Sequence, residues 1–88
     1  MSNFPSATLD ANLELDARQL ACPMPLLKAR QAMRQLADGE LLHVIASDPG
    51  ARRDIPAWVG QSGHELVHQG EEQGVLHFWI RCREEKQG

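Results

Sequence analysis

The sequence predicts an α/β (α+β) two-layer sandwich in which two helices cover one face of a four-stranded mixed sheet. Segments that alternate apolar and polar residues are separated by two stretches of helical periodicity, which gives the order βαβαββ. The chain has 88 residues, enough for one domain with one modest core. Two helices cannot cover both faces of such a sheet, so both are expected on the same face.

The first half of the chain predicts a strand, a helix and a second strand. Leu13, Leu15 and Ala17 alternate with polar residues, as in a strand with one buried face. A helix is predicted from Pro25 to Ala37, followed by Gly39 as a left-handed stop. Residues 41–46 (LLHVIA) predict a buried strand. The apolar stripe of the helix contains Leu26, Ala29, Met33, Leu36 and Ala37.

The second half begins with a predicted turn at residues 47–50 (SDPG) and a second helix that contains Pro56. Proline lacks an N–H, so either a loose turn precedes a helix that begins near Asp54, or Pro56 kinks a longer helix. Gly63 is expected to end this helix. A short strand over 65–69, a hairpin turn over 70–74 and a last strand follow. The core face of the last strand carries Leu76, Phe78, Ile80 and Cys82.

Composition bounds the function classes. Nine Lys and Arg against twelve Asp and Glu give a net charge of −3, which argues against nucleic acid as a direct partner. The first ten residues lack the basic start and apolar run of a secretory signal, and no stretch approaches a membrane span. Two cysteines do not make a disulfide framework. We expect a cytoplasmic protein with a flexible arm at 1–11, one domain at 12–83 and a polar tail at 84–88.

Cys22 is the candidate reactive residue. It lies between the first strand and the first helix, where the positive end of a helix lowers a thiol pKa to about 3.5–7.5 from about 8.5. Pro23 and Pro25 remove two N–H donors and disfavour helical geometry in the residues before them. The prolines therefore suit a rigid, outward-held sulfur, and we predict only a modest depression of the pKa of Cys22.

Charged residues are expected near Cys22. If the first two strands are parallel, their carboxyl ends share one sheet edge, which carries Cys22 and residues 48–54. Each arginine there is most simply a solvated charge; the alternative is that it stabilises an anionic sulfur or docks an acidic partner. Asp48 and Asp54 are most simply helix N-caps. The arginines in question are Arg52, Arg53 and Arg18.

Three cations, Lys28, Arg30 and Arg34, lie on or beside the exposed face of the first helix. They are either a solvated helix surface or a docking strip for an acidic partner. The second cysteine, Cys82, continues the core alternation and is expected to be buried and inert.

The chain resembles the TusA-like (SirA-like) sulfurtransferase family. Residues 20–26 (LACPMPL) carry the resemblance, together with Ser47-Asp48-Pro49 and Arg53-Asp54-Ile55-Pro56, and it spans about residues 11–83. It implies a two-layer sandwich like the C-terminal domain of translation initiation factor three. It also implies that Cys22 carries sulfur as a persulfide, loaded by a cysteine desulfurase or another donor and passed to an acceptor protein toward tRNA 2-thiolation. Met24 fills the variable motif position, where acidic residues are common.

Other hypotheses stay open. One alternative is a non-catalytic interaction module in which Cys22 is only an adapted helix cap. Another is RNA binding, which rests on fold analogy alone. A metal site would combine Cys22 or Cys82 with histidines, but their spacing matches no known ligand pattern, so we expect neither a metal nor another cofactor. The histidines are His43, His64, His68 and His77.

Overall fold

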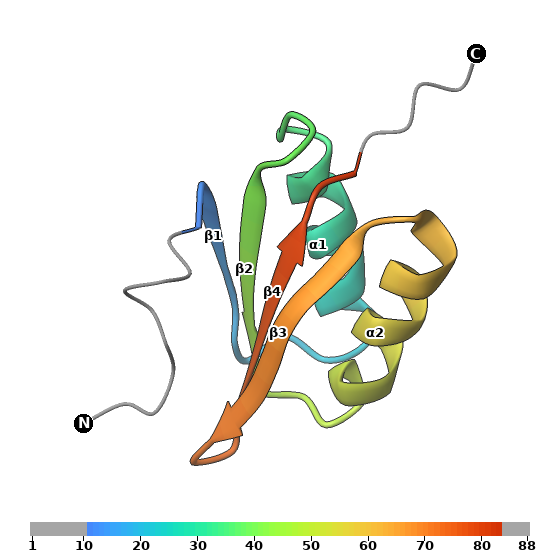
Figure 1. Ribbon diagram of the computed structural model, residues 1–88. Helices are drawn as coiled ribbons and strands as arrows, with labels where there is room; N and C mark the ends of the chain where they lie inside the picture. Colours follow the sequence, from blue (N-terminus) through green and yellow to red (C-terminus); the bar gives the residue numbers. More distant parts are fainter. Residues whose placement is uncertain (1–10, 84–88) are drawn as a thin grey trace.

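A computed structural model describes residues 11–83; the predicted tail at 84–88, and all of the predicted arm except Ala11, lie outside the described residues. Figure 1 shows a two-layer molecule in which both helices lie on the same face of the sheet. The predicted βαβαββ order and fold class are confirmed. The elements are β1 (Leu13–Ala17), α1 (Met24–Met33), β2 (Leu41–Ala46), α2 (Ala51–Ser62), β3 (Glu65–Glu72) and β4 (Val75–Arg81).

The strand order in the sheet is β1-β2-β4-β3. β1 and β2 run parallel, with Ala17 opposite Ala46 at their carboxyl ends, and the other two pairs are antiparallel. The loops that follow β1 and β2 therefore leave the sheet at the same end (Figure 1). This is the edge on which the sequence placed Cys22 and residues 48–54.

The core lies between the sheet and the two helices. Fully buried side chains reach it from β2 and β4, from α1 through Ala29 and from α2 through Ile55. Each large apolar side chain buried in this way stabilises the fold by about 1.5–3 kcal/mol. Cys82 is only 3% exposed and belongs to this cluster, as the strand alternation predicts.

α1 ends earlier than predicted, at Met33 rather than Ala37. The N–H groups of Arg34, Gln35 and Leu36 donate to carbonyls three residues back, so the last turn tightens instead of continuing as α-helix. Ala37 consequently lies exposed, and Ala32 takes a place in the core that the predicted stripe did not include.

α2 begins at Ala51 and contains Pro56, so of the two alternatives the structure has the longer helix and not a loose turn from Gly50 to Arg53. The Asp54 N–H already donates to the Gly50 carbonyl, which places Asp54 in the first turn rather than at the N-cap. Asp48 lies before the cap, and its Oδ2 accepts the Gly50 N–H at 2.9 Å. The prediction that both aspartates are N-caps is therefore wrong. Gly63 ends the helix with φ 91°, as predicted.

The hairpin is tighter than predicted. β3 extends to Glu72, and only Gln73 and Gly74 separate it from β4. Both have positive φ, 54° and 80°, which is the geometry that a two-residue hairpin turn needs to match the twist of its strands. Within residues 11–83, neither helix is long and apolar enough to cross a membrane.

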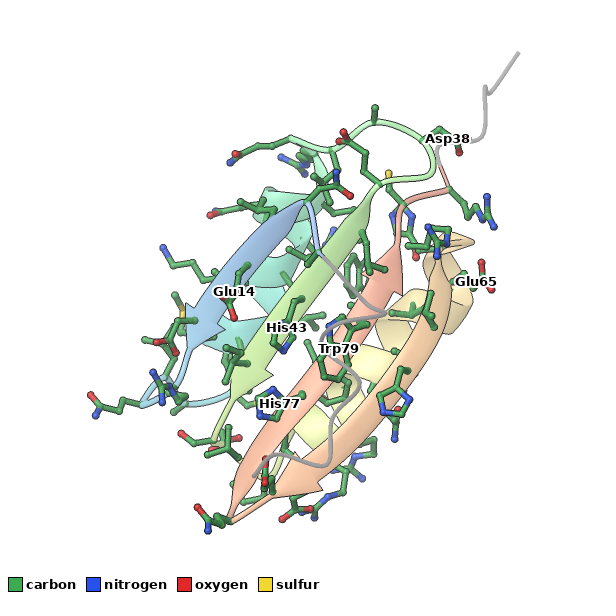
Figure 2. All side chains as sticks on the ribbon, turned by 60° about the vertical axis from the view of Figure 1, so that its left-hand side comes forward. Glu14, Asp38, His43, Glu65, His77 and Trp79 are labelled. Atoms are coloured by element: carbon green, nitrogen blue, oxygen red, sulfur yellow. The ribbon has the colours of Figure 1, made fainter. Side chains whose placement is uncertain are left out.

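The sheet face opposite the helices carries a cluster of rings (Figure 2). His43 stacks on Trp79 with ring centroids 4.3 Å apart, and His68 and His77 flank the same indole. His43 Nε2 lies 2.9 Å from His77 Nδ1, and Glu14 Oε2 lies 3.2 Å from His43 Nδ1. Trp79 is only 2% exposed although no helix covers its face.

Candidate functional site

Cys22 lies in the loop between β1 and α1, half-buried at the shared carboxyl edge of β1 and β2. Its Sγ donates a hydrogen bond to Asp54 Oδ2 at 2.9 Å. Asp48 lies in the loop after β2, where its Oδ2 accepts the Gly50 N–H, and it is a second carboxylate that raises the pKa of the thiol. The structure thus brings together the cysteine and the two aspartates that the sequence singled out on the same edge.

Two prolines shape the chain on either side of this sulfur. Pro23 is the N-cap of α1 and Pro25 is fully buried beneath the first turn. The peptide bond between Cys22 and Pro23 is cis. The Met24 N–H donates to the Ala21 carbonyl at 2.8 Å and is therefore engaged by the backbone. The start of α1 thus holds the loop in place, and it has no side-chain cap.

The loop that carries Cys22 is also tied to the loop after β2. Gln19 adopts a positive φ of 71°, unusual for a residue with a side chain, and its N–H donates to Ser47 Oγ at 2.9 Å. A cleft of about 230 Å³ lies along this contact and is lined by residues 19–21 and 47–49. Ser47 therefore positions the segment that leads into Cys22.

Gly50 is a site residue that sequence reasoning treated only as part of a turn. A Cβ at this position would lie 2.8 Å from Asp48 Oδ2 and 2.9 Å from Cys22 Sγ. Only glycine therefore allows the backbone of the second loop to approach the sulfur so closely. The signal in the sequence was the glycine at the end of Ser47-Asp48-Pro49-Gly50, but the contact itself joins two loops.

The predicted depression of the Cys22 pKa is wrong. The hydrogen bond to Asp54, burial of the sulfur, and then the Asp48 carboxylate raise the pKa of the Cys22 thiol to about 12. Two carboxylates favour the protonated thiol because a thiolate between them would meet like charge. The sequence placed both aspartates on this edge but assigned them to the backbone as caps, and so it missed their effect on the sulfur.

Arg18, Arg52 and Arg53 are exposed, in line with the simpler expectation of solvated charges rather than contacts to an anionic sulfur. Arg18 pairs with Asp16 through two hydrogen bonds of 2.9 and 2.7 Å, and Arg52 pairs with Glu71 at 2.6 Å. Arg53 is exposed and makes no ion pair within residues 11–83. No arginine hydrogen bond or ion pair to Cys22 occurs among the described residues.

The exposed surface of α1 combines charge with apolar area. Met24 and Leu27, in its first turns, are each 40% exposed. Lys28 and Arg30 follow them, and Arg34 lies just past the end of the helix, all exposed and without an ion pair in the described part of the chain. Arg30 and Arg34 also line a cleft of about 250 Å³ with Met33 and Trp58. Sequence analysis did not single out Leu27, which falls outside the buried stripe.

The metal alternative finds no support in the geometry. Among residues 11–83, no three or more His, Cys, Asp or Glu side chains are grouped so as to hold a metal ion. His43 and His77 bond to each other across the sheet face, and Cys82 lies in the core.

Comparison with known proteins shows which family the chain resembles. The model of the family described as Sulfurtransferase TusA matches residues 13–82. The sulfur carrier protein TusA of Allochromatium vinosum is 44% identical over 72 residues, which cover 82% of this chain and 95% of that protein. The putative sulfur carrier protein YrkI of Bacillus subtilis is 46% identical over 67 residues, which cover 76% of this chain and 89% of that protein.

A solved structure shares the fold. The SirA-like protein from Desulfitobacterium hafniense superposes with a TM-score of 0.71 at 22% identity, over 82% of this chain and 99% of that chain. The family match covers almost all described residues, including Cys22, Asp48 and Asp54. The resemblance that the Cys22 motif indicated is confirmed, and the chain belongs to the TusA sulfurtransferase family.

Proposed function

We propose that this protein is a sulfur carrier that accepts a sulfur atom on Cys22 as a persulfide and passes it to the thiol of an acceptor protein. The relatives TusA and YrkI, which are named as a sulfur carrier protein and a putative sulfur carrier protein, support this class of function. The observation that carries it is the half-exposed thiol at the loop edge, with the second cysteine buried in the core.

The distribution of the two thiols suits a carrier. A second accessible cysteine near a persulfide would attack it and release the sulfur. Cys82 is 3% exposed and its Sγ lies 3.7 Å from the Leu36 carbonyl, within the core. A persulfide on Cys22 would therefore persist until a partner thiol reaches it.

The surface beside Cys22 supports transfer between proteins. Met24 and Leu27 offer apolar area to a partner, and Lys28, Arg30, Arg34 and Arg52 are the proposed partner-binding cations. A partner with an acidic rim around an apolar spot would complement this surface. Pro23, Pro25, Asp48, Arg53 and Asp54 are the proposed supporting residues of the motif.

The test is sulfur loading by a cysteine desulfurase in the presence of free cysteine. We expect intact mass to increase by one sulfur atom, cyanide to remove that atom, and peptide mapping to place it on Cys22. Cys22→Ser should gain none, whereas Cys82→Ser should load like the unchanged protein if it remains folded. Loading of Cys22→Ser equal to that of the unchanged protein would refute the assignment.

The route we propose runs from a cysteine desulfurase, through this carrier, to a relay for 2-thiolation of a tRNA wobble uridine in the cytoplasm. Loss of 2-thiouridine from tRNA in a deletion strain, restored by the unchanged gene and not by Cys22→Ser, would support it. Normal 2-thiouridine would assign the carrier to another branch of sulfur metabolism.

One observation favours a second function, that of a non-catalytic interaction module. The Cys22 thiol donates its proton to Asp54 Oδ2 at 2.9 Å, which favours the protonated and weakly nucleophilic form of the sulfur at neutral pH. In that function, Cys22 would gain no cyanide-labile sulfur from the desulfurase, and Cys22→Ser would bind partners as well as the unchanged protein does.

A further inference from the structure

We propose that the carboxylates of Asp54 and Asp48 set how tightly Cys22 holds a second sulfur atom, favouring the empty thiol over the persulfide. This inference rests on the proposed carrier function and goes beyond it. It assigns the two aspartates a part in the transfer reaction: they make the loaded protein a strong sulfur donor.

The first argument is a hydrogen bond that only the empty state can make. Cys22 Sγ donates its proton to Asp54 Oδ2 at 2.9 Å. In the persulfide this sulfur is bonded to the outer sulfur and carries no proton, so the bond is lost on loading. Hydrogen bonds to charged groups are stronger than neutral ones, so their loss shifts an equilibrium measurably.

The second argument is the position of Asp48. Its Oδ2 accepts the Gly50 N–H at 2.9 Å, and a Cβ on Gly50 would touch both this oxygen and Cys22 Sγ. Asp48 is therefore a second carboxylate close to the sulfur, in addition to Asp54. A persulfide S–H is more acidic than a thiol S–H, so the loaded state brings negative charge toward them, which like charge disfavours. The raised pKa of Cys22 reflects the same preference for the protonated thiol.

The third argument is that stabilising the empty Cys22 thiol makes the persulfide on the same cysteine a stronger sulfur donor. Thiol–disulfide proteins whose reduced form is stabilised are strong oxidants, and a persulfide exchanges by the same chemistry. The exchange with glutathione persulfide is Cys22–SH + GS–SH → Cys22–S–SH + GSH. The S–S bond to Cys22 forms as that to glutathione breaks, the Cys22 proton ends on the glutathione sulfur, and the reaction consumes no external oxidant.

The test is the equilibrium of this exchange with glutathione persulfide at fixed ratios to glutathione, read as loaded and empty protein by intact mass. Asp54→Asn removes the charge and keeps the shape, and should raise the loading constant about tenfold. Asp48→Asn should raise it less, because Asp48 affects the thiol less than Asp54 does. Asp38→Asn is the matched control, at the far end of the sheet (Figure 2), and should change nothing.

Equal loading constants for Asp54→Asn and the unchanged protein would overturn this inference and leave the carrier function intact. If no variant, nor the unchanged protein, gained sulfur from excess persulfide, the proposed function would fall and the inference with it.

A second measurement separates an effect on the sulfur from a loss of structure. The alkylation rate of Cys22 by iodoacetamide, followed by peptide mapping across pH, should have its midpoint at lower pH in Asp54→Asn and Asp48→Asn. A purely structural role would lower the unfolding midpoint in urea without moving the pH midpoint of alkylation, and that result would overturn the inference.

Discussion

Around the Cys22 sulfur, the loop after β1 meets the first turn of α2 and the loop before that helix. Asp54 Oδ2 accepts the thiol proton at 2.9 Å, Asp48 lies beside Gly50, and Gly50 leaves the space that this close approach needs. Helix α1 supplies the prolines that hold the loop, but α2 and the loop before it determine the protonation of the sulfur. The reactivity of Cys22 is thus a property of the contact between two loops and not of its own motif.

Replacing Gly50 tests this contact. In Gly50→Ala the new methyl would overlap Asp48 Oδ2 at 2.8 Å and Cys22 Sγ at 2.9 Å, so these side chains or the loops that carry them must shift. We expect the free energy of unfolding to fall by about 1–3 kcal/mol, measured by urea titration. We also expect the pH midpoint of Cys22 alkylation to shift.

The control is Gly60→Ala, also a glycine-to-alanine change but in α2, where a Cβ would have no atom within 4 Å. It should raise the free energy of unfolding by about 0.5–1 kcal/mol, because alanine favours helix over glycine. If the two variants had the same free energy of unfolding, the close approach of the two loops at Gly50 would not contribute to stability.

At the scale of the elements, α1 presents two different faces. Ala29, Ala32 and Met33 pack into the core, while Met24 and Leu27 remain 40% exposed next to Cys22. Exposed apolar side chains beside a reactive group are typical of a surface that a partner covers. The first turns of this helix therefore combine the reactive loop with the proposed docking surface.

If Leu27 is a central anchor of the docking surface, Leu27→Asn should weaken binding to the cysteine desulfurase about tenfold, because truncation of such a hot-spot residue costs more than about 1 kcal/mol. The free energy of unfolding of the Leu27→Asn variant should change by less than about 0.5 kcal/mol, because the side chain lies at the surface. Calorimetric titration measures the affinity. Gln61→Asn, on the exposed part of α2, is the control and should bind normally. Unchanged affinity of Leu27→Asn would place the partner elsewhere.

The hairpin between β3 and β4 allows a separate test of local sequence preference. Gln73 has φ 54°, a conformation in which asparagine is much more common than glutamine. Gln73→Asn should stabilise the fold by about 0.5 kcal/mol, which corresponds to about 2–4 °C in the thermal midpoint. Gln69→Asn, within β3, should give no such gain, and equal midpoints for both variants would contradict the turn geometry.

At the scale of the whole molecule, the sheet has one face under the helices and one that carries the ring cluster. Glu14, His43 and His77 come from three strands and form a hydrogen-bonded row across that face (Figure 2). Burial lowers the pKa of both histidines, and for His43 the neighbouring His77 lowers it further. Two protonated rings would each be donors only, so their mutual hydrogen bond requires that one be neutral.

The pH dependence of stability follows from these pKa values. The unfolded chain binds protons at these histidines near pH 6.5, whereas the folded chain binds them only at lower pH. Their contribution to stability is therefore present above pH 6.5 and lost as pH falls through the folded pKa values. Glu14 and Glu72 oppose the lowering at His77 and Arg18 adds to it, so desolvation sets the sign.

Urea unfolding, followed by tryptophan fluorescence across pH, measures this effect. The double variant His43→Asn, His77→Asn should show a smaller loss of stability below pH 6.5 than the unchanged protein. His64→Asn is the control, because its ring packs against Trp58, away from the row. If the double variant and the unchanged protein lose equal stability, the acid sensitivity lies in other groups.

Much of the fold was determined locally and could be predicted from sequence. Alternation marked β1 and β4, a nearly continuous apolar run marked β2, helical periodicity marked the two helices, and Gly63 marked a helix end, because these signals lie within each element. Element boundaries were less predictable. Whether α1 continues past Met33, and whether α2 starts at Ala51 or near Asp54, depends on which hydrogen bonds the backbone makes at the helix ends.

The sequence by itself determined the sheet edge on which Cys22, Asp48 and Asp54 meet, because parallel strands joined by a helix place their carboxyl ends together. Only the tertiary structure decided what the aspartates do there. Whether an aspartate caps a helix or faces a thiol depends on a few ångströms between two loops that are distant in sequence, and Gly50 allows that approach. The row formed by Glu14, His43 and His77 depends in the same way on the register of the three strands that carry these residues.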